Sequence, residues 1–483
     1  MSGETVIPLK EIKNRVVKSF MSLTARQIAL RVISFISLNV ILAKVLPVET
    51  LGIFNIATAV ITFFAFFSDI GLAASLIQKK EAVTDADIKT VFTIQQLIIT
   101  TLSLVIILSA PFIGDFYALN EDGVWLVRVL GVAFFLSSLK VVPAVLLERE
   151  LKFQPLVVVE IVETLTFNTL LVLAVFQGLG LWSFSIAALF RGVIGTVLIY
   201  ILAPAKVGFR IEKAAALKLL SFGIPFQLNS ILALLKDRLV PLVIARMVGP
   251  VGIGYITWSQ ALAFLPLEVM NIIIRITFPA FSRMQDDKQS LSKAIEKSLF
   301  ATSLLVYPVL FGLAAILPSL VLYVVSPKWQ PAVSSFYLFA FSTFWAVIST
   351  TFTNVLNAVG CIRVTLKLMV FWTVLTWVLT PILVIFYGFT GVALASFLIS
   401  FTSVITVVLI KRFIKVRVLE AIYLPTLSSM IMGVSVYLFA NNFVRGWEAL
   451  IPTVALGVII YSVLTLLLGK ERVYTELKSL RNV

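Results

Sequence analysis

The chain has 483 residues, of which 60% are hydrophobic and 13% are charged, and its mean hydropathy is +1.06. Apolar runs of about 20 residues recur along it, which excludes a soluble globular domain and is typical of a polytopic membrane protein. Lipid-facing backbone groups must be bonded internally and the runs are too long for barrel strands, so we expect the spans to be α-helices.

The formal net charge is +15, and the sequence has one cysteine, Cys361, and no histidine. In a membrane protein the positions of the charges matter more than their sum, and most lie between the spans, so we expect no nucleic-acid partner. The single cysteine excludes an intrachain disulfide, and without histidine the usual zinc and iron ligand sets are missing. We therefore expect no metal and no metal catalysis. The protein is also expected to have no cofactor and no enzymatic activity.

The first 22 residues form a basic tail, and the apolar run that follows continues to about Leu46. This run is too long for a signal peptide and has no convincing cleavage site, so we expect it to stay as the first span. Fourteen spans are predicted in all. They cover residues 23–46, 51–77, 89–113, 123–146, 154–176, 180–203, 218–246, 251–281, 297–325, 332–359, 366–387, 390–411, 420–440 and 448–469.

The connections between these spans differ sharply in charge from one side to the other. Counting Lys and Arg in alternate connections gives 27 on the side of the N-terminus and 3 on the opposite side. Positively charged loops stay in the cytoplasm. The count predicts that both termini are cytoplasmic and that the protein lies in the cytoplasmic (inner) membrane.

Two short sequence echoes suggest an internal repeat. Residues 47–54 resemble residues 249–255, and 178–181 resemble 388–392, with about six spans between the members of each pair. A repeat of an even number of spans keeps its orientation, as in transporters that rock one lobe against another. We therefore expect two pseudo-symmetric six-helix lobes around a central cavity, with the last two helices peripheral. The predicted parts are a basic tail (1–22), an N-lobe (23–203), a linker (204–217), a C-lobe (218–411), two peripheral spans (412–469) and a tail (470–483).

The stretch 221–283 contains two long apolar segments joined at Gly249 and Pro250. A charged side chain at bilayer depth costs about 2.5–3.5 kcal/mol on insertion scales, so such residues are retained for a function. This stretch carries six of them, and we expect a movable hairpin beside a polar cavity. The six are Lys236, Asp237, Arg238, Arg246, Glu268 and Arg275.

Leaving aside the residues at span ends that are counted with the connections, the ionisable residues inside the predicted spans lie in the first eight. Nine are basic: Arg26, Arg31, Arg128, Lys140, Arg191, Lys236, Arg238, Arg246 and Arg275. Five are acidic: Asp69, Glu160, Glu163, Asp237 and Glu268. The excess of cations predicts a cavity of positive potential and an anionic cargo.

Several of the cations have an alternative explanation. Arg26, Lys140 and Arg275 lie within about two turns of the cytoplasmic face, where a long side chain can extend to the interface. Arg191 is near the middle of its span, so the cavity is the better explanation there. Arg31 shares a helical stripe with Gln27 and Ser34, a polar face that lipid would not tolerate.

The acidic residues have several possible roles. Glu160 and Glu163 are three residues apart on one helix face, where they could pair with Arg191 or Arg31 or carry protons. We expect the partner of Asp237 on another span, because its sequence neighbours do not face it. Asp69, just before Gly71, could simply cap or bend its helix.

Specific residues resemble the polysaccharide transporter family, the Wzx-type lipid-linked oligosaccharide flippases of the multidrug/oligosaccharidyl-lipid/polysaccharide exporter superfamily. The similarity covers most of residues 15–415. It is carried by residues 67–80 (FSDIGLAASLIQKK), 147–153 (LERELKF), Asp237-Arg238, Gly254-Tyr255 and 278–282 (FPAFS).

The resemblance implies a flippase that moves an undecaprenyl-diphosphate-linked oligosaccharide from the cytoplasmic to the outer leaflet by alternating access. Arginine matches phosphate geometry, so the diphosphate contacts are expected among the cations. They are Arg31 and Arg191, with Arg26, Arg128, Arg275, Lys236 and Arg238 as further candidates. If an H⁺ or Na⁺ gradient drives transport, the coupling candidates are Glu160, Glu163, Asp237, Glu268 and Asp69.

The expected partners are the lipid-linked glycan, membrane lipids, a polysaccharide polymerase and chain-length proteins, with the protein itself a monomer. Three other functions are considered. A drug-export antiporter would transport organic cations, and a scaffold for synthesis enzymes would tolerate neutralised cavity charges. A membrane glycosyltransferase would need a soluble domain, and no connection is long enough for one.

Overall fold

The computed structural model describes residues 29–68, 70–79, 81, 83–205, 207–228 and 239–481. Throughout these residues the regular secondary structure is helical, with no strand, which confirms the all-α membrane fold. Twelve helices of this described part are long and apolar enough to cross a bilayer. The predicted spans 23–46 and 218–246 lie partly outside the described residues, so the total of fourteen stays a prediction.

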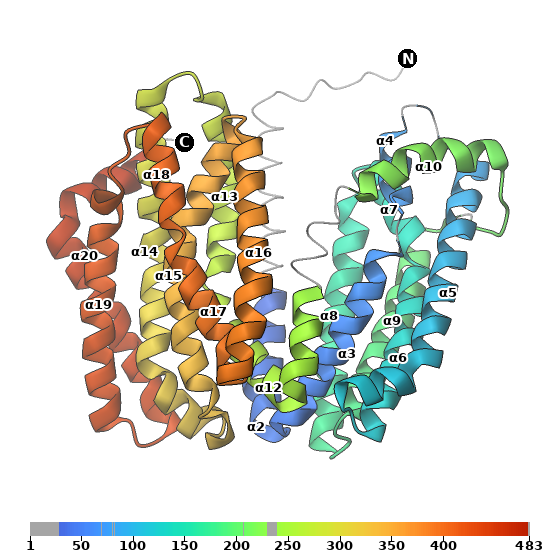
Figure 1. The fold of residues 1–483 in the computed structure, drawn as a ribbon, viewed down its shortest axis with the longest axis horizontal. Coiled ribbons are helices and arrows are strands. Elements are labelled where there is room, and N and C mark those ends of the chain that lie inside the picture. The colour runs from blue at the N-terminus through green and yellow to red at the C-terminus, as the bar shows by residue number, and fades with distance from the viewer. Residues whose placement is uncertain are drawn as a thin grey trace. The chain divides into compact units, whose positions relative to one another are not determined.

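The chain divides into two compact units, Met1–Leu242 and Val243–Val483. Figure 1 labels the helices of both. Unit 1 contains η1 (Ser37–Leu42), α2 (Ala43–Val45), α3 (Val48–Phe66), α4 (Leu72–Gln78), α5 (Asp85–Tyr117), α6 (Glu121–Ser138), α7 (Val141–Arg149), α8 (Phe153–Phe176), α9 (Trp182–Leu202) and α10 (Lys213–Leu228). Helix α12 (Val240–Phe264) begins at the boundary. Unit 2 continues with α13 (Leu267–Arg283), α14 (Lys288–Leu320), η3 (Val321–Val325), η4 (Pro327–Trp329), α15 (Ala332–Ala358), α16 (Ile362–Tyr387), α17 (Thr390–Phe401), α18 (Val404–Phe413), α19 (Val418–Phe443), η5 (Trp447–Ala449) and α20 (Leu450–Arg481).

The predicted second span, 51–77, is two helices rather than one. Helix α3 ends at Phe66, and α4 starts after Gly71, whose φ of 81° lies in the left-handed region that glycine adopts at little cost. The sequence allows a helix bend near Asp69. The structure has the interruption at Gly71, and Asp69 itself lies outside the described residues. The short α4 packs against α7 and α10 through a cluster of buried side chains that includes Leu72, Leu76 and Val142.

Arg149, at the end of α7, binds the carbonyls at the C-terminal end of α4. Its guanidinium donates to the carbonyl oxygens of Leu76 and Ile77 and, at 2.8 Å, to that of Glu81. A cation at this position satisfies acceptors that the helix leaves without donors. Two of the connections rich in Lys and Arg thus meet at one end of unit 1.

Helices α6 and α7 are separated by a break at Leu139 and Lys140. Pro143 has no N–H group to donate to the Leu139 carbonyl four residues earlier. That carbonyl accepts a hydrogen bond of 3.0 Å from the Tyr200 hydroxyl of α9 instead. Lys140 lies at this break and belongs to the site described below.

The predicted junction between spans at Gly249 and Pro250 lies inside α12. Gly249 is non-helical there, with φ 69° and ψ −179°. The predicted span 251–281 is also interrupted, because α12 ends at Phe264 and α13 starts after Pro266. Proline cannot continue the hydrogen-bond ladder of the preceding turn, so the chain restarts as a new helix.

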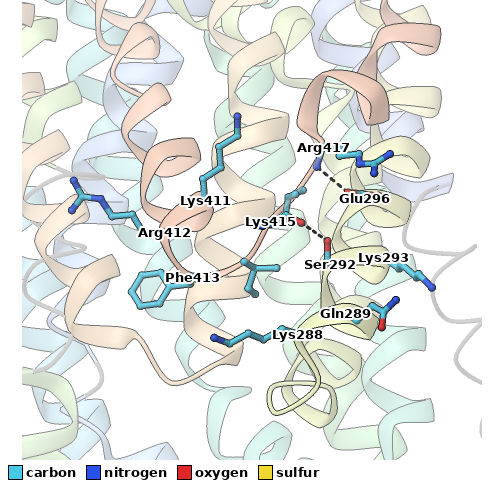
Figure 2. A pocket seen from close by; sticks show the side chains of 12 residues that line it. Lys288, Gln289, Ser292, Lys293, Glu296, Lys411, Arg412, Phe413, Lys415 and Arg417 are labelled. Atoms are coloured by element: carbon cyan, nitrogen blue, oxygen red, sulfur yellow. Dashed lines mark hydrogen bonds between the residues drawn. The ribbon is translucent and has the colours of Figure 1, made fainter.

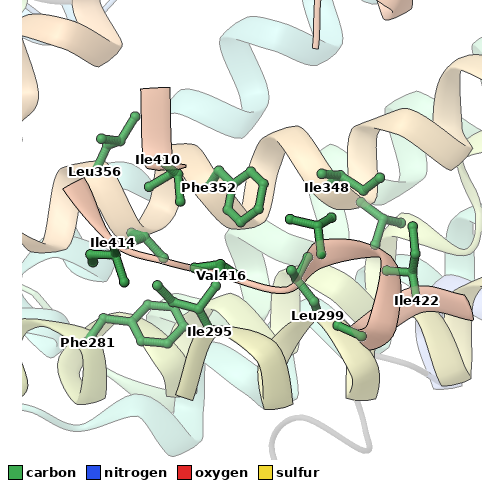
Figure 3. Packing of buried hydrophobic residues seen from close by; sticks show 14 of the residues in the cluster. Phe281, Ile295, Leu299, Ile348, Phe352, Leu356, Ile410, Ile414, Val416 and Ile422 are labelled. Carbon is green, nitrogen blue, oxygen red and sulfur yellow. The ribbon is translucent and has the colours of Figure 1, made fainter. Parts of the chain in front are cut away.

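The core of unit 2 surrounds the connection between α18 and α19 (Figure 3). Ile414 is extended, with φ −143° and ψ 135°, and alternate side chains of an extended segment point to opposite sides. Ile414 and Val416 are accordingly buried, and they belong to the same cluster as Ile295 and Leu299 of α14. The intervening Lys415 and the following Arg417 are exposed.

Candidate functional site

A buried carboxylate, Glu163 of α8, lies between two cations from neighbouring helices. Its side chain is 4% exposed. The Lys140 ammonium donates a hydrogen bond to Glu163 Oε1, and Arg191 Nε of α9 lies 3.9 Å from Glu163 Oε2. Helices α8 and α9 run side by side (Figure 1), which brings Glu163 and Arg191 together. A buried carboxylate is retained in a low-dielectric interior only when it is paired in this way.

Gly195 makes room for that carboxylate. A Cβ atom at Gly195 would lie 1.5 Å from Glu163 Oε1, closer than any non-bonded contact allows. Gly195 comes four residues after Arg191, so the two share one face of α9. The glycine lets the carboxylate fit against the helix backbone, and the arginine one turn away pairs with it.

The seam between α6 and α9 beside this cluster is held by polar contacts. Thr196 Oγ1 donates to the Leu136 carbonyl at 2.8 Å, and with the Tyr200 bond it satisfies two carbonyls near the α6–α7 break. Both hydroxyls leave α9 on the side of Lys140. These two contacts join α9 to the residues just before Lys140.

Arg191 is anchored on one side and half exposed on the other. Its side chain is 49% exposed, and its guanidinium carbon lies 5.8 Å from the centre of the Phe167 ring. The Arg191 atom that faces Glu163 is Nε. The planar guanidinium can also bind a planar or tetrahedral anion with two parallel hydrogen bonds. Two cations and one carboxylate leave the cluster with a net positive charge.

The structure places the other predicted residues of unit 1 separately. Glu160 is exposed, one turn before the buried Glu163, so the two carboxylates have different surroundings. Ser34, in the predicted stripe with Arg31, accepts a 3.1 Å hydrogen bond from Asn168 Nδ2 of α8. Arg31 itself is exposed in the helical residues 29–36.

Arg128 of α6 lies over the ring of Trp125, three residues earlier in the same helix. Its guanidinium carbon is 4.7 Å from the centre of the Trp125 ring, a cation–π contact. Lys140 is twelve residues further along, about 18 Å on a helical rise of 1.5 Å. The structure therefore does not place Arg128 in the Glu163 cluster.

In unit 2, Glu268 and Arg275 share the exposed face of α13 with Asn271 between them. Glu268 lies in the first turn, where its negative charge is favourable to the helix dipole. Five predicted residues lie outside the described part of the chain: Arg26, Asp69, Lys236, Asp237 and Arg238.

Sequence reasoning found Glu163 and Arg191 as one possible pair and missed Lys140 as the second partner. Lys140 lies close to the end of its predicted span, so a side chain that extends to the membrane interface was a sufficient explanation for a charge at this position. The available signals were Pro143, which predicts a break nearby, and Gly195, which predicts a close approach to the Arg191 face of its helix.

Comparisons of the sequence with known proteins find relatives named for polysaccharide biosynthesis, and the comparison with solved structures finds a shared fold. A family model described as "Polysaccharide biosynthesis protein" matches residues 41–334. The lipopolysaccharide biosynthesis protein WzxC of Escherichia coli (strain K12) is 25% identical over 372 residues, covering 76% of this chain and 74% of WzxC. The succinoglycan biosynthesis transport protein ExoT of Rhizobium meliloti (strain 1021) is 24% identical over 88% of both chains. Among solved structures, the lipid II flippase MurJ in an inward closed conformation has a TM-score of 0.75 at 14% identity, covering 94% of this chain and all of MurJ, a likeness of fold.

Proposed function

The chain belongs to the family of polysaccharide biosynthesis proteins, and we propose that it is a flippase for a lipid-linked oligosaccharide. Two of its relatives are named for lipopolysaccharide and succinoglycan biosynthesis, the second as a transport protein. The proposed substrate is an oligosaccharide repeat unit on undecaprenyl diphosphate. It moves from the cytoplasmic to the outer leaflet by alternating access.

The observation that carries the substrate class is the state of Arg191. This guanidinium lies near the middle of a membrane-spanning helix, has its Nε 3.9 Å from Glu163 Oε2 and is half exposed. An intramembrane cation that is positioned but not neutralised favours an anionic ligand, and a diphosphate is the anionic group of the proposed substrate. Arg31, exposed in the same unit, is proposed as a second contact.

The proposed orientation, with both termini in the cytoplasm and the protein in the inner membrane, is supported by the count of Lys and Arg. Hydrogen bonds within unit 1 support it. Besides the contacts of Arg149, the Arg210 N–H donates to Thr93 Oγ1 at 2.8 Å, so a third basic connection meets the same end of the unit.

Coupling to an H⁺ or Na⁺ gradient is proposed through an acidic side chain. Of the candidates in the described part of the chain, Glu163 is committed to two cations, whereas Glu160 and Glu268 are exposed. We therefore assign Glu163 to positioning Arg191 and favour the two exposed carboxylates for coupling. The proposed partners are a polysaccharide polymerase and chain-length proteins, which act on the product, and the proposed oligomeric state is a monomer.

The small-molecule antiporter is the less supported alternative. Both sequence relatives above are named for polysaccharide biosynthesis, and the membrane-embedded charge of unit 1 is positive at its buried cluster. A cavity for organic cations would be expected to carry the opposite charge.

Reconstitution tests the function directly. Purified full-length protein in proteoliposomes should expose a fluorescent undecaprenyl-diphosphate oligosaccharide to a membrane-impermeant glycosidase faster than empty liposomes do. Transport of organic cations without movement of the glycolipid would overturn the flippase and favour the antiporter.

A further inference from the structure

A groove with cations on half of its lining positions lies at one end of unit 2 (Figure 2). Its volume is about 1110 Å³, and its twelve lining residues include six Lys or Arg and a single Glu. Lys288 and Lys293 come from the first turns of α14. The other four come from the end of α18 and its connection to α19: Lys411, Arg412, Lys415 and Arg417. The groove therefore has two positively charged walls.

The wall formed by the α18–α19 connection is held in place by hydrogen bonds to α14. The Ser292 hydroxyl donates to the Lys415 carbonyl at 2.6 Å, and the Arg417 N–H donates to Glu296 Oε1 at 2.8 Å. Figure 2 shows both bonds. On the side that faces the core of unit 2, the connection is held by the buried side chains of Ile414 and Val416. The cations are thus presented on a fixed backbone rather than on a free loop.

Nearby acids neutralise little of this charge. In the part of the chain that the structure describes, Arg417 alone of the six has a carboxylate within 4.0 Å, that of the exposed Glu420 at 3.3 Å. Glu296 is occupied by the Arg417 N–H group. Asp287 caps α14, and hydrogen bonds from Ser290 hold the pKa of that carboxyl below its usual range. An excess of positive charge remains along the groove.

The groove lies at the level of lipid headgroups. Phe413 ends one candidate membrane span, Val418 begins the next, and four residues connect them. Such a connection reaches at most about 14 Å when fully extended, so its cations stay close to the bilayer surface. The helical stretch Lys288–Val325 has 38 residues, which is about 57 Å against a hydrocarbon core of about 30 Å, and its polar first turns extend beyond that core.

We propose that this groove binds an anionic phospholipid whose headgroup carries two phosphates, as in diphosphatidylglycerol. One phosphate contacts the α14 wall, and the other contacts the wall of the α18–α19 connection. Basic pockets between membrane helices at the cytoplasmic surface bind headgroups of this type, and Lys and Arg form strong charge-assisted hydrogen bonds with phosphate. The exposed apolar residue Phe413, which also lines the groove, adjoins the glycerol and the start of the acyl chains. The site is separate from the proposed glycolipid contact at Arg191.

Two double variants test the walls, and a third serves as a control of equal charge change. The walls are neutralised in Lys288→Gln/Lys293→Gln and in Arg412→Gln/Lys415→Gln. The control, Lys152→Gln/Arg210→Gln, removes two exposed cations from connections of unit 1. All six side chains are exposed, so folding should be unaffected, and size-exclusion chromatography checks this.

Native mass spectrometry of the delipidated, full-length protein measures binding of diphosphatidylglycerol, phosphatidylglycerol and inorganic pyrophosphate. Wild type and control should bind diphosphatidylglycerol about tenfold more tightly than phosphatidylglycerol, and each wall variant should lose that preference. An equal loss in the control, or a preference kept by both wall variants, would overturn the proposal. Competition by pyrophosphate at the same concentration as the lipid would also overturn it, in favour of a soluble anion.

Discussion

Glu163 is buried and shares its two oxygens between Lys140 and Arg191. Replacing it by glutamine leaves the buried part of the Lys140 side chain without a counter-charge. We expect Glu163→Gln to lower the free energy of unfolding by about 2–3 kcal/mol, less than for a fully buried pair because Lys140 is partly exposed. Thermal unfolding in detergent measures this. The exposed Glu160→Gln is the control, with a change within about 0.5 kcal/mol, and equal losses in both would contradict the pairing.

Gly195 should not tolerate even one methyl group. The added Cβ of Gly195→Ala would collide with Glu163 Oε1, so the carboxylate or α9 must shift. We expect a loss of stability of about 1–3 kcal/mol. Gly312→Ala in α14 is the matched control, because its Cβ would meet only Met432 Cε at 3.7 Å. If alanine at position 195 is as stable as at 312, the close approach at Glu163 is wrong.

At the scale of single residues, the sequence identified ionisable side chains within the spans but only part of their contacts. An ionisable side chain in the middle of an apolar run, such as Arg191, stands out without any structure. Its partner does not, because Glu163 could reach cations on several neighbouring spans. The Lys140 contact depends on a local break and on how α6 packs against α9, neither of which a helical period encodes.

Among the helices, the kink of α12 at Gly249 makes the clearest prediction. The combination of φ 69° and ψ −179° is essentially confined to glycine. Gly249→Ala should therefore destabilise the protein by about 1–3 kcal/mol. Gly446→Ala is the control, because that glycine is extended, with φ −168°, and has open space around it. Equal melting temperatures for the two variants in detergent would show that the kink is not strained.

The membrane helices themselves were largely predictable, because each needs a long apolar run. Their interruptions were not. Prolines lie inside α5, α13, α14, α16 and α19 without ending them: Pro111, Pro279, Pro308, Pro318, Pro381 and Pro425. Pro266, however, separates two helices. Neighbouring helices decide whether the freed backbone groups find partners, so the same residue type has either outcome.

For the whole molecule, the charge count predicts a topology that the single cysteine can test. Cys361 is a free, partly buried thiol between α15 and α16, on the side assigned to the cytoplasm. A membrane-impermeant maleimide should label it after lysis but not in intact cells. In a Cys361→Ser background, Arg445→Cys on the opposite side should be labelled in intact cells. The reverse pattern would invert the orientation.

The account depends most on Arg191 as the group that binds the diphosphate of the substrate. The direct measurement is the affinity of the purified full-length protein for undecaprenyl diphosphate. We predict that Arg191→Gln weakens binding by about tenfold or more, that Arg191→Lys restores only part of it, and that the loop variant Arg445→Gln binds normally. Unchanged affinity in a correctly folded Arg191→Gln variant would contradict the central claim.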